Sequence, residues 1–67
     1  MELSARNQFK GKVKSVKLGT VMAEVVVEVA GNDVVSEITK SSVERLKLQA
    51  GDAVTVIIKS TEVMIGK

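Results

Sequence analysis

The chain has 67 residues, of which 45% are hydrophobic, and it contains no cysteine, histidine, tyrosine or tryptophan. This composition excludes a disulfide framework and a thiolate metal site. It also removes the imidazole on which zinc sites and most nucleophile–base pairs depend, so we expect a binding protein and not an enzyme. The net charge of +2 at pH 7 is too small to predict general nucleic-acid binding.

The length predicts one domain, spanning residues 1–67, and self-association. A chain of this size buries only ~60% of the surface that it exposes when unfolded. Without disulfides or a structural metal, the usual remaining support is an oligomer. No apolar run approaches the ~20 residues that span a bilayer, and the N-terminus lacks the apolar stretch of a signal peptide, so we expect a cytoplasmic protein with no membrane partner.

The first predicted strand begins at Phe9, where apolar residues alternate with lysines as far as Val13. Beyond Val13 the pattern slips by one position, because Val16 and Leu18 are apolar. Such a slip predicts a β-bulge near Ser15, which lets a long strand bend around a small barrel. We expect Phe9 itself in the core.

Two further strands form a predicted hairpin. Alternation over residues 21–29 is typical of a half-buried strand, the turn formers at residues 30–33 end it, and residues 34–39 resume the strand pattern. Toward the C-terminus, residues 53–59 predict a fourth strand and residues 62–65 a short fifth one.

The one helical candidate spans residues 42–48, between the third and fourth strands. Ser41 followed by Glu44 matches a capping box, with Ser41 as the N-cap and Glu44 at N3. This order of elements predicts an all-β fold, a five-stranded OB-fold-like barrel with one short helix between strands 3 and 4.

Several strands place apolar residues on the face that should contact water, namely Met22, Val26, Val35 and Ile57. Scattered surface valines are common in single domains. A small barrel cannot bury both faces of its strands, however, so the pattern favours subunit interfaces.

Three clusters of hydrogen-bond donors indicate a site for a small oxyanion. They lie at residues 4–8, 39–42 and 59–61, and they combine hydroxyl, amide and basic side chains. The free backbone N–H groups at a helix start also favour an anion. Simpler explanations stay open, because Ser41 can serve only as a cap and Arg6 can be an ordinary surface charge.

Single-stranded nucleic acid is an alternative ligand. Lys10, Lys12, Lys14 and Lys17 on the first strand can contact phosphates. Proteins that bind single strands stack bases on aromatic side chains, each worth ~1–3 kcal/mol, and Phe9 is the only aromatic residue here. This composition disfavours nucleic acid.

Particular segments of the sequence also carry a family resemblance. They are the S-A-R-N-Q opening at residues 4–8 with Gly11, Ile38-Thr39, residues 42–44, residues 48–52, and residues 58–64, which contain K-S-T-E-V-M. Together they resemble the molybdenum-pterin-binding (Mop) domain of the TOBE/Mop family, whose small stand-alone members are called molbindins. The similarity covers essentially the whole chain in the same order.

The resemblance implies a protein that binds molybdate or tungstate for intracellular storage or homeostasis of molybdenum. It implies a homo-oligomer, a hexamer built as a trimer of dimers, with anions bound between subunits. Ser4, Arg6, Lys59 and Ser60 would come from one subunit, and Thr39 and Ser42 from its neighbour. Molybdenum would be bound only as the oxyanion, with no metal ligands of its own.

Two further expectations concern the cofactor and the biological role. We expect no organic cofactor, since a planar pterin needs stacking surfaces that a chain without tyrosine or tryptophan lacks. An alternative role is a regulatory OB-fold module that acts in trans on a molybdate transporter or repressor.

Overall fold

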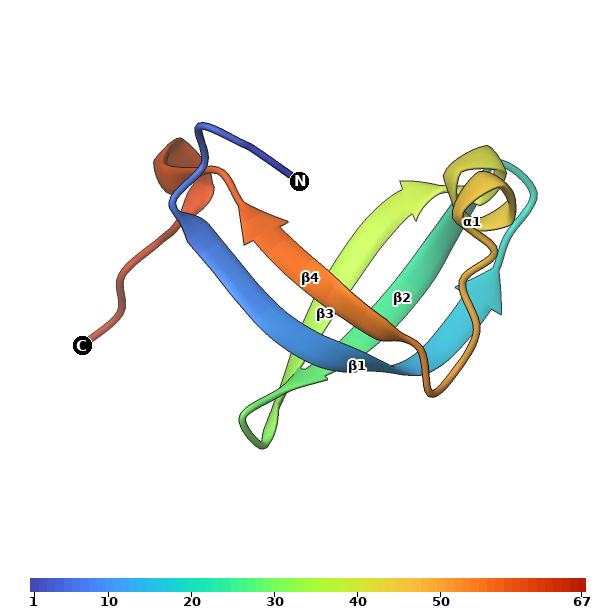
Figure 1. Cartoon of the computed structure of the whole chain (residues 1–67), viewed down its shortest axis with the longest axis horizontal. Helices are drawn as coiled ribbons and strands as arrows, with labels where there is room; N and C mark the ends of the chain where they lie inside the picture. The colour runs from blue at the N-terminus through green and yellow to red at the C-terminus, as the bar shows by residue number, and fades with distance from the viewer.

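The computed structural model describes all 67 residues. It contains one antiparallel four-stranded sheet, in the order β3-β2-β1-β4, and one short α-helix (Figure 1). The elements are β1 (Asn7–Leu18), β2 (Met22–Val29), β3 (Asn32–Thr39), α1 (Lys40–Leu46), β4 (Ala53–Ile58) and the 3₁₀ turn η1 (Ser60–Glu62). No helix is long and apolar enough to cross a membrane.

The predicted bulge in the first strand is confirmed. Val13 pairs with Val27 and Ser15 with Val26, so Lys14 is the extra residue on β1. Its ammonium nitrogen lies 2.9 Å from a carboxylate oxygen of Asp33, which lies on β3 beside the turn of the β2–β3 hairpin. This hydrogen bond, with the attraction of the opposite charge, raises the pKa of Lys14. The bulge therefore bends β1 and ties it to the neighbouring hairpin.

The bent strand β1 pairs with two neighbouring strands. Its first half pairs with β4 from Asn7 to Lys12, and its second half pairs with β2 from Lys12 to Leu18. Gly11 lies where the strands approach each other closely, since a Cβ at this position would stand 2.5 Å from the carbonyl oxygen of Glu28. The absence of a side chain at position 11 therefore allows β1 to approach the backbone of β2 this closely.

The β2–β3 hairpin is confirmed, with a tighter turn than expected. Ala30 and Gly31 alone form the loop, with φ of 49° and 82°, and Val29 pairs with Asn32. Positive φ at both central residues is typical of the type I′ turn that joins twisted strands. The second strand of the hairpin consequently begins at Asn32.

The core lies on the concave face of the sheet, under α1. Its buried residues are Val13, Ala23, Val25, Val27 and Val43. The prediction that Phe9 lies in the core is wrong for the single chain, because its side chain is 44% exposed. Phe9 is on the same face as Val13, but it lies near the start of β1, and Figure 1 shows that this end of β1 is far from α1.

The predicted helix start is also wrong. The helix spans Lys40–Leu46, and its N-cap is Thr39, whose hydroxyl accepts the backbone N–H of Ser42 at 3.1 Å. Thr39 takes this role because it is the last extended residue of β3, with φ −71° and ψ 148°. Lys47 ends the helix in the left-handed conformation.

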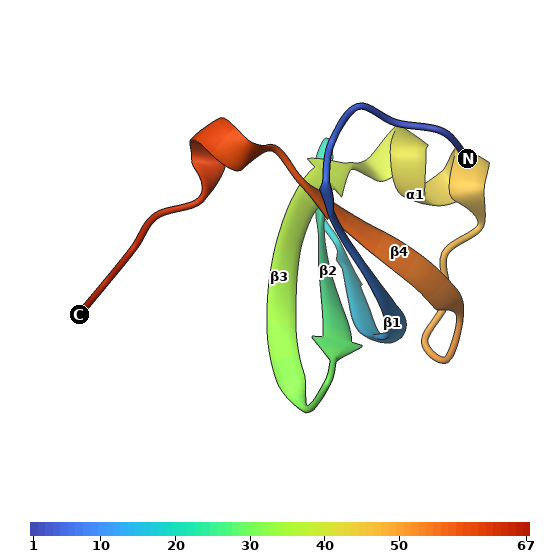
Figure 2. The same ribbon diagram turned by 60° about the vertical axis from the view of Figure 1, so that its left-hand side comes forward.

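The predicted fifth strand does not form in the single chain. Ser60–Glu62 make a 3₁₀ turn, and residues 63–67 have no regular structure. A strand requires a neighbour for its backbone groups, and the turn directs the chain away from the sheet (Figure 2). The protein is therefore mostly β, with an open sheet instead of a closed five-stranded barrel.

Candidate functional site

Residues from both ends of the chain line one open depression. Its volume is about 630 Å³, and its lining residues are Ser4, Ala5, Arg6, Asn7, Lys59 and Ser60. The two segments are neighbours because Asn7 pairs with Ile58 where β1 begins and β4 ends. We call Ser4, Arg6, Lys59 and Ser60 the N-terminal cluster. The structure thus brings together four residues that the sequence predicted as ligands.

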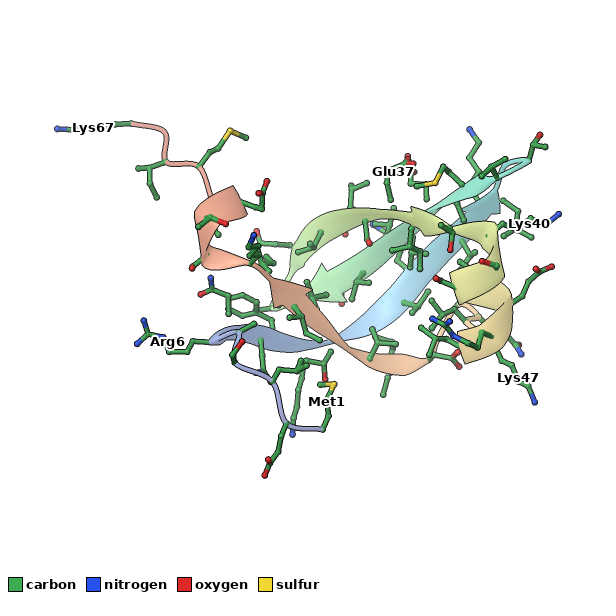
Figure 3. The ribbon with its side chains drawn as sticks, turned by 90° about the horizontal axis from the view of Figure 1, so that it is seen from above. Met1, Arg6, Glu37, Lys40, Lys47 and Lys67 are labelled. Carbon is green, nitrogen blue, oxygen red and sulfur yellow. The ribbon has the colours of Figure 1, made fainter.

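The N-terminal cluster is rich in donors that have no partner within the chain. The one ion pair in the structure joins Lys14 to Asp33, so Arg6 and Lys59 have no carboxylate beside them. No side-chain hydrogen bond involves any member of the cluster. Figure 3 shows the Arg6 side chain pointing away from the sheet into solvent. The depression is therefore positively charged, and its side chains are free to donate hydrogen bonds to a ligand.

Two local hydrogen bonds that the sequence did not predict shape this segment. The Gln8 side-chain amide donates to the carbonyl oxygen of Ala5, and the Gln8 backbone N–H donates to the carbonyl of Arg6 at 3.1 Å. Both bonds tie the first residues of β1 to the segment that precedes it. Gln8 is thus a positioning residue, while Asn7 adds an amide to the lining.

The other two predicted ligands, Thr39 and Ser42, lie at the start of α1, and we call them the helix-start cluster. The Thr39 hydroxyl donates to the Ser42 hydroxyl at 2.8 Å and accepts the Ser42 backbone N–H. The Ser42 N–H is therefore paired within the chain and is not one of the free N–H groups at the helix start. The Ser42 hydroxyl still has its own hydrogen to donate.

The two clusters lie at opposite ends of the molecule (Figure 1). The N-terminal cluster adjoins the start of β1, whereas Thr39 pairs with Met22, beside the end of β1. The 12 residues of β1 separate them, and an extended strand rises about 3.3 Å per residue. One chain cannot place all six predicted residues around one small anion.

The comparisons with known proteins agree with one another. Residues 3–65 match the family model described as the TOBE domain. "Molybdenum-pterin-binding protein 3" of Clostridium pasteurianum is 56% identical over 66 residues, which are 97% of each chain.

Two solved structures share the fold closely. MopII from Clostridium pasteurianum has a TM-score of 0.93 at 51% identity, over 98% of this chain and 100% of that one. A molybdate-binding protein from Sporomusa ovata has a TM-score of 0.95 at 42% identity, over 100% of both chains. These relatives agree with the resemblance seen in the sequence.

Proposed function

Because the chain belongs to the TOBE domain family, whose model matches residues 3–65, we propose that it binds molybdate and tungstate and stores them in the cytoplasm. The observation that carries the proposal is the N-terminal cluster, in which Arg6 and Lys59 share one depression with two hydroxyls and no carboxylate. Relatives named for molybdate and for molybdenum-pterin support the choice of anion. The role is binding, without catalysis.

The chemistry of the N-terminal cluster suits a tetrahedral dianion. Molybdate has four oxygens that only accept hydrogen bonds, so its site needs donors from several directions and positive charge. Arg6 offers a planar fork of donors and Lys59 a compact charge, and charge-assisted hydrogen bonds are roughly twice as strong as neutral ones. Ser4 and Ser60 can each turn a hydroxyl toward an oxygen.

The site is completed by a second copy of the chain. The depression is open to solvent, and Ser4, Arg6, Lys59 and Ser60 are all exposed, so one chain does not enclose an anion there. The helix-start cluster of a neighbouring chain, Thr39 and Ser42, supplies the missing wall. The resulting assembly is a homohexamer, a trimer of dimers.

The selectivity of the site for molybdate over other oxyanions follows from a lining that is rich in hydrogen-bond donors. Phosphate carries a proton near neutral pH, and that proton finds no charged acceptor among Ser4, Arg6, Lys59 and Ser60, where only the two serine hydroxyls can accept it. Sulfate carries no proton but has shorter bonds to oxygen, so some donors are left unpaired, at a cost of ~1–3 kcal/mol for each buried one. Tungstate is nearly the size of molybdate and is bound equally.

No organic cofactor takes part. A pterin is a planar ring system that binds by stacking on aromatic side chains, and Phe9, the only aromatic residue, does not line the depression. The polar lining instead suits the oxyanion alone.

Calorimetric titration with molybdate, in a buffer with a large excess of sulfate, tests the proposed function. We expect saturable heat at a stoichiometry near one anion per chain, and competition by tungstate. Absence of heat in sulfate, together with heat in its absence, would contradict the proposed selectivity. Absence of heat in both buffers would remove the function itself.

A further inference from the structure

The depression at the N-terminal cluster is bordered by peptide groups as well as by side chains. Ala5 and Arg6 both belong to its lining, and Ala5 is half-buried there. Each residue carries a backbone carbonyl, which only accepts hydrogen bonds, and a backbone N–H, which only donates them. A carbonyl oxygen repels an anion, whereas an N–H attracts it. The orientation of these peptide groups therefore affects which anions the depression accepts.

Gln8 forms hydrogen bonds with both of these carbonyls. Its side-chain amide donates to the Ala5 carbonyl oxygen, and its backbone N–H donates to the Arg6 carbonyl oxygen at 3.1 Å. Gln8 is not itself one of the lining residues. Two acceptors of the lining are therefore directed toward a residue outside the depression.

The same arrangement leaves a backbone donor free. In a trans peptide group the C=O and the following N–H point in opposite directions, so the Arg6 N–H points away from the Ala5 carbonyl oxygen that Gln8 holds. Arg6 precedes β1, and its N–H has no acceptor within the chain. The segment thus offers a free N–H while the neighbouring carbonyl is occupied.

The sheet fixes the position of Gln8. It is the second residue of β1 and pairs with Ile57 of β4, so its backbone gives the Ala5 carbonyl a partner that is anchored in the sheet. The only other glutamine, Gln49, lies in the loop between α1 and β4. The Gln49 side chain makes no hydrogen bond.

We propose that Gln8 determines the selectivity of the site against oxyanions that carry a proton, because its side chain occupies the Ala5 carbonyl oxygen that would otherwise accept this proton. The inference rests on the proposed function, since it concerns the same depression. Gln8 acts through the peptide groups of Ala5 and Arg6 and does not touch the anion, so it is a positioning residue.

The other polar groups of the lining do not make this distinction. The two serine hydroxyls of the N-terminal cluster can each donate or accept, and Asn7 can present either its NH₂ group or its carbonyl oxygen. The two basic side chains only donate. Without the Gln8 bond, the Ala5 carbonyl becomes a free group in the lining that can only accept.

Phosphate and sulfate are the pair of anions that separates this effect from size. Both are tetrahedral and similar in size, but phosphate keeps a proton near neutral pH and sulfate does not. A free carbonyl accepts the proton of phosphate, whereas it repels the oxygens of sulfate and molybdate alike. Loss of the Gln8 bond therefore favours phosphate and weakens the two unprotonated dianions to the same degree.

Gln8→Met tests the proposal, because it removes the side-chain donor and keeps the length of the side chain. Calorimetric titration with molybdate near neutral pH, in buffer alone and with a fixed excess of phosphate or of sulfate, gives the affinity for each anion. We expect the ratio of molybdate affinity to phosphate affinity to fall roughly fivefold or more. The ratio of molybdate affinity to sulfate affinity should stay within about twofold of that of the parent chain.

Two further variants serve as controls. Gln49→Met makes the same change at the glutamine whose side chain has no hydrogen bond, and both ratios should stay within about twofold of the parent values. Gln8→Lys restores a donor for the Ala5 carbonyl, so we expect it to keep the molybdate-to-phosphate ratio of the parent chain. Its added charge attracts every anion and largely cancels from a ratio of affinities.

Two results would overturn the role of Gln8. One is that phosphate displaces molybdate no better from Gln8→Met than from the parent chain. The other is an equal fall of both ratios, because a segment that has merely lost its shape does not distinguish phosphate from sulfate. Either result, with molybdate bound by the parent chain, leaves the proposed function in place. A parent chain that gives no heat with molybdate removes the function and the selectivity together.

Discussion

At the scale of single residues, the basic side chains differ in whether they form an ion pair with a carboxylate. The chain has 10 basic and 8 acidic residues, yet only Lys14 forms an ion pair. Arg6 and Lys59 stand together in one depression that has no acidic residue in its lining. Their shared field, and not the net charge of the chain, is what attracts a dianion.

Replacement of Arg6 tests this distinction. Arg6→Ala removes charge-assisted hydrogen bonds worth ~1.5–3 kcal/mol, so we expect molybdate affinity to fall by roughly tenfold to a hundredfold. Lys12→Ala removes the same charge from the middle of β1, outside the depression, and should change affinity by less than about twofold. Calorimetry of the two variants makes the comparison, and equal losses would indicate a diffuse electrostatic surface.

At the scale of elements, the close approach of β1 to β2 depends on the absence of a side chain at position 11. A Cβ there would stand 2.5 Å from the Glu28 carbonyl oxygen and 2.8 Å from side-chain atoms of Val27 and Val29. The Glu28 oxygen belongs to the backbone of β2 and cannot rotate aside. Any substitution must therefore separate the two strands that hold most of the core.

We expect Gly11→Ala to lower the free energy of unfolding by ~1–3 kcal/mol, because the added methyl overpacks the sheet. Gly66→Ala is the matched control, since nothing lies within 4 Å of a Cβ at that position, and should change stability by less than about 0.5 kcal/mol. Urea unfolding measures both. A Gly11→Ala variant as stable as the parent chain would mean that β1 and β2 can separate freely.

The elements that the sequence predicts correctly are those that depend on local patterns. Alternation identified the strands, its slip after Val13 identified the bulge, and the turn formers at residues 30–33 identified the hairpin, whose loop is only Ala30 and Gly31. The helix start was misplaced because both Ser41 and Thr39 can cap a helix, and only the end of β3 decides between them. The strand at residues 62–65 was predicted from the local sequence alone, which says nothing about where its partner is.

At the scale of the whole molecule, the single chain is incomplete in two ways. Only 5 of 67 residues are buried, while large apolar side chains such as Val35 and Ile57 stay 61% and 43% exposed. The two donor clusters face opposite ends of the molecule (Figure 1). Both features are explained if the functional unit is an assembly of several copies.

Because the site depends on an assembly of several copies, the sequence of one chain could predict only part of it. Residue types alone gave separate clusters at residues 4–8 and 59–61, and the family resemblance implied that Ser4, Arg6, Lys59 and Ser60 belong to one subunit. The pairing of Asn7 with Ile58 brings these four residues together. Their joining to Thr39 and Ser42 was an implication of family resemblance. It depends on how two copies meet, which no pattern of spacing along one chain specifies.

The most direct test of an anion shared between chains is complementation between two defective variants. Arg6→Ala damages the N-terminal cluster. Ser42→Asp places a negative charge in the helix-start cluster, and α1 should tolerate it because an acidic residue is favourable in the first turn of a helix, where it has none now. Each variant alone should bind molybdate weakly, since every one of its sites contains the defect.

The measurement is calorimetric titration of the two variants refolded together in equal amounts. If each site takes one cluster from each of two chains, random mixing unites the two intact clusters in roughly a quarter of the sites, and that fraction should bind with the affinity of the unmodified protein. A mixture that binds no better than the separate variants would show that each site lies within one chain, and would contradict the shared site.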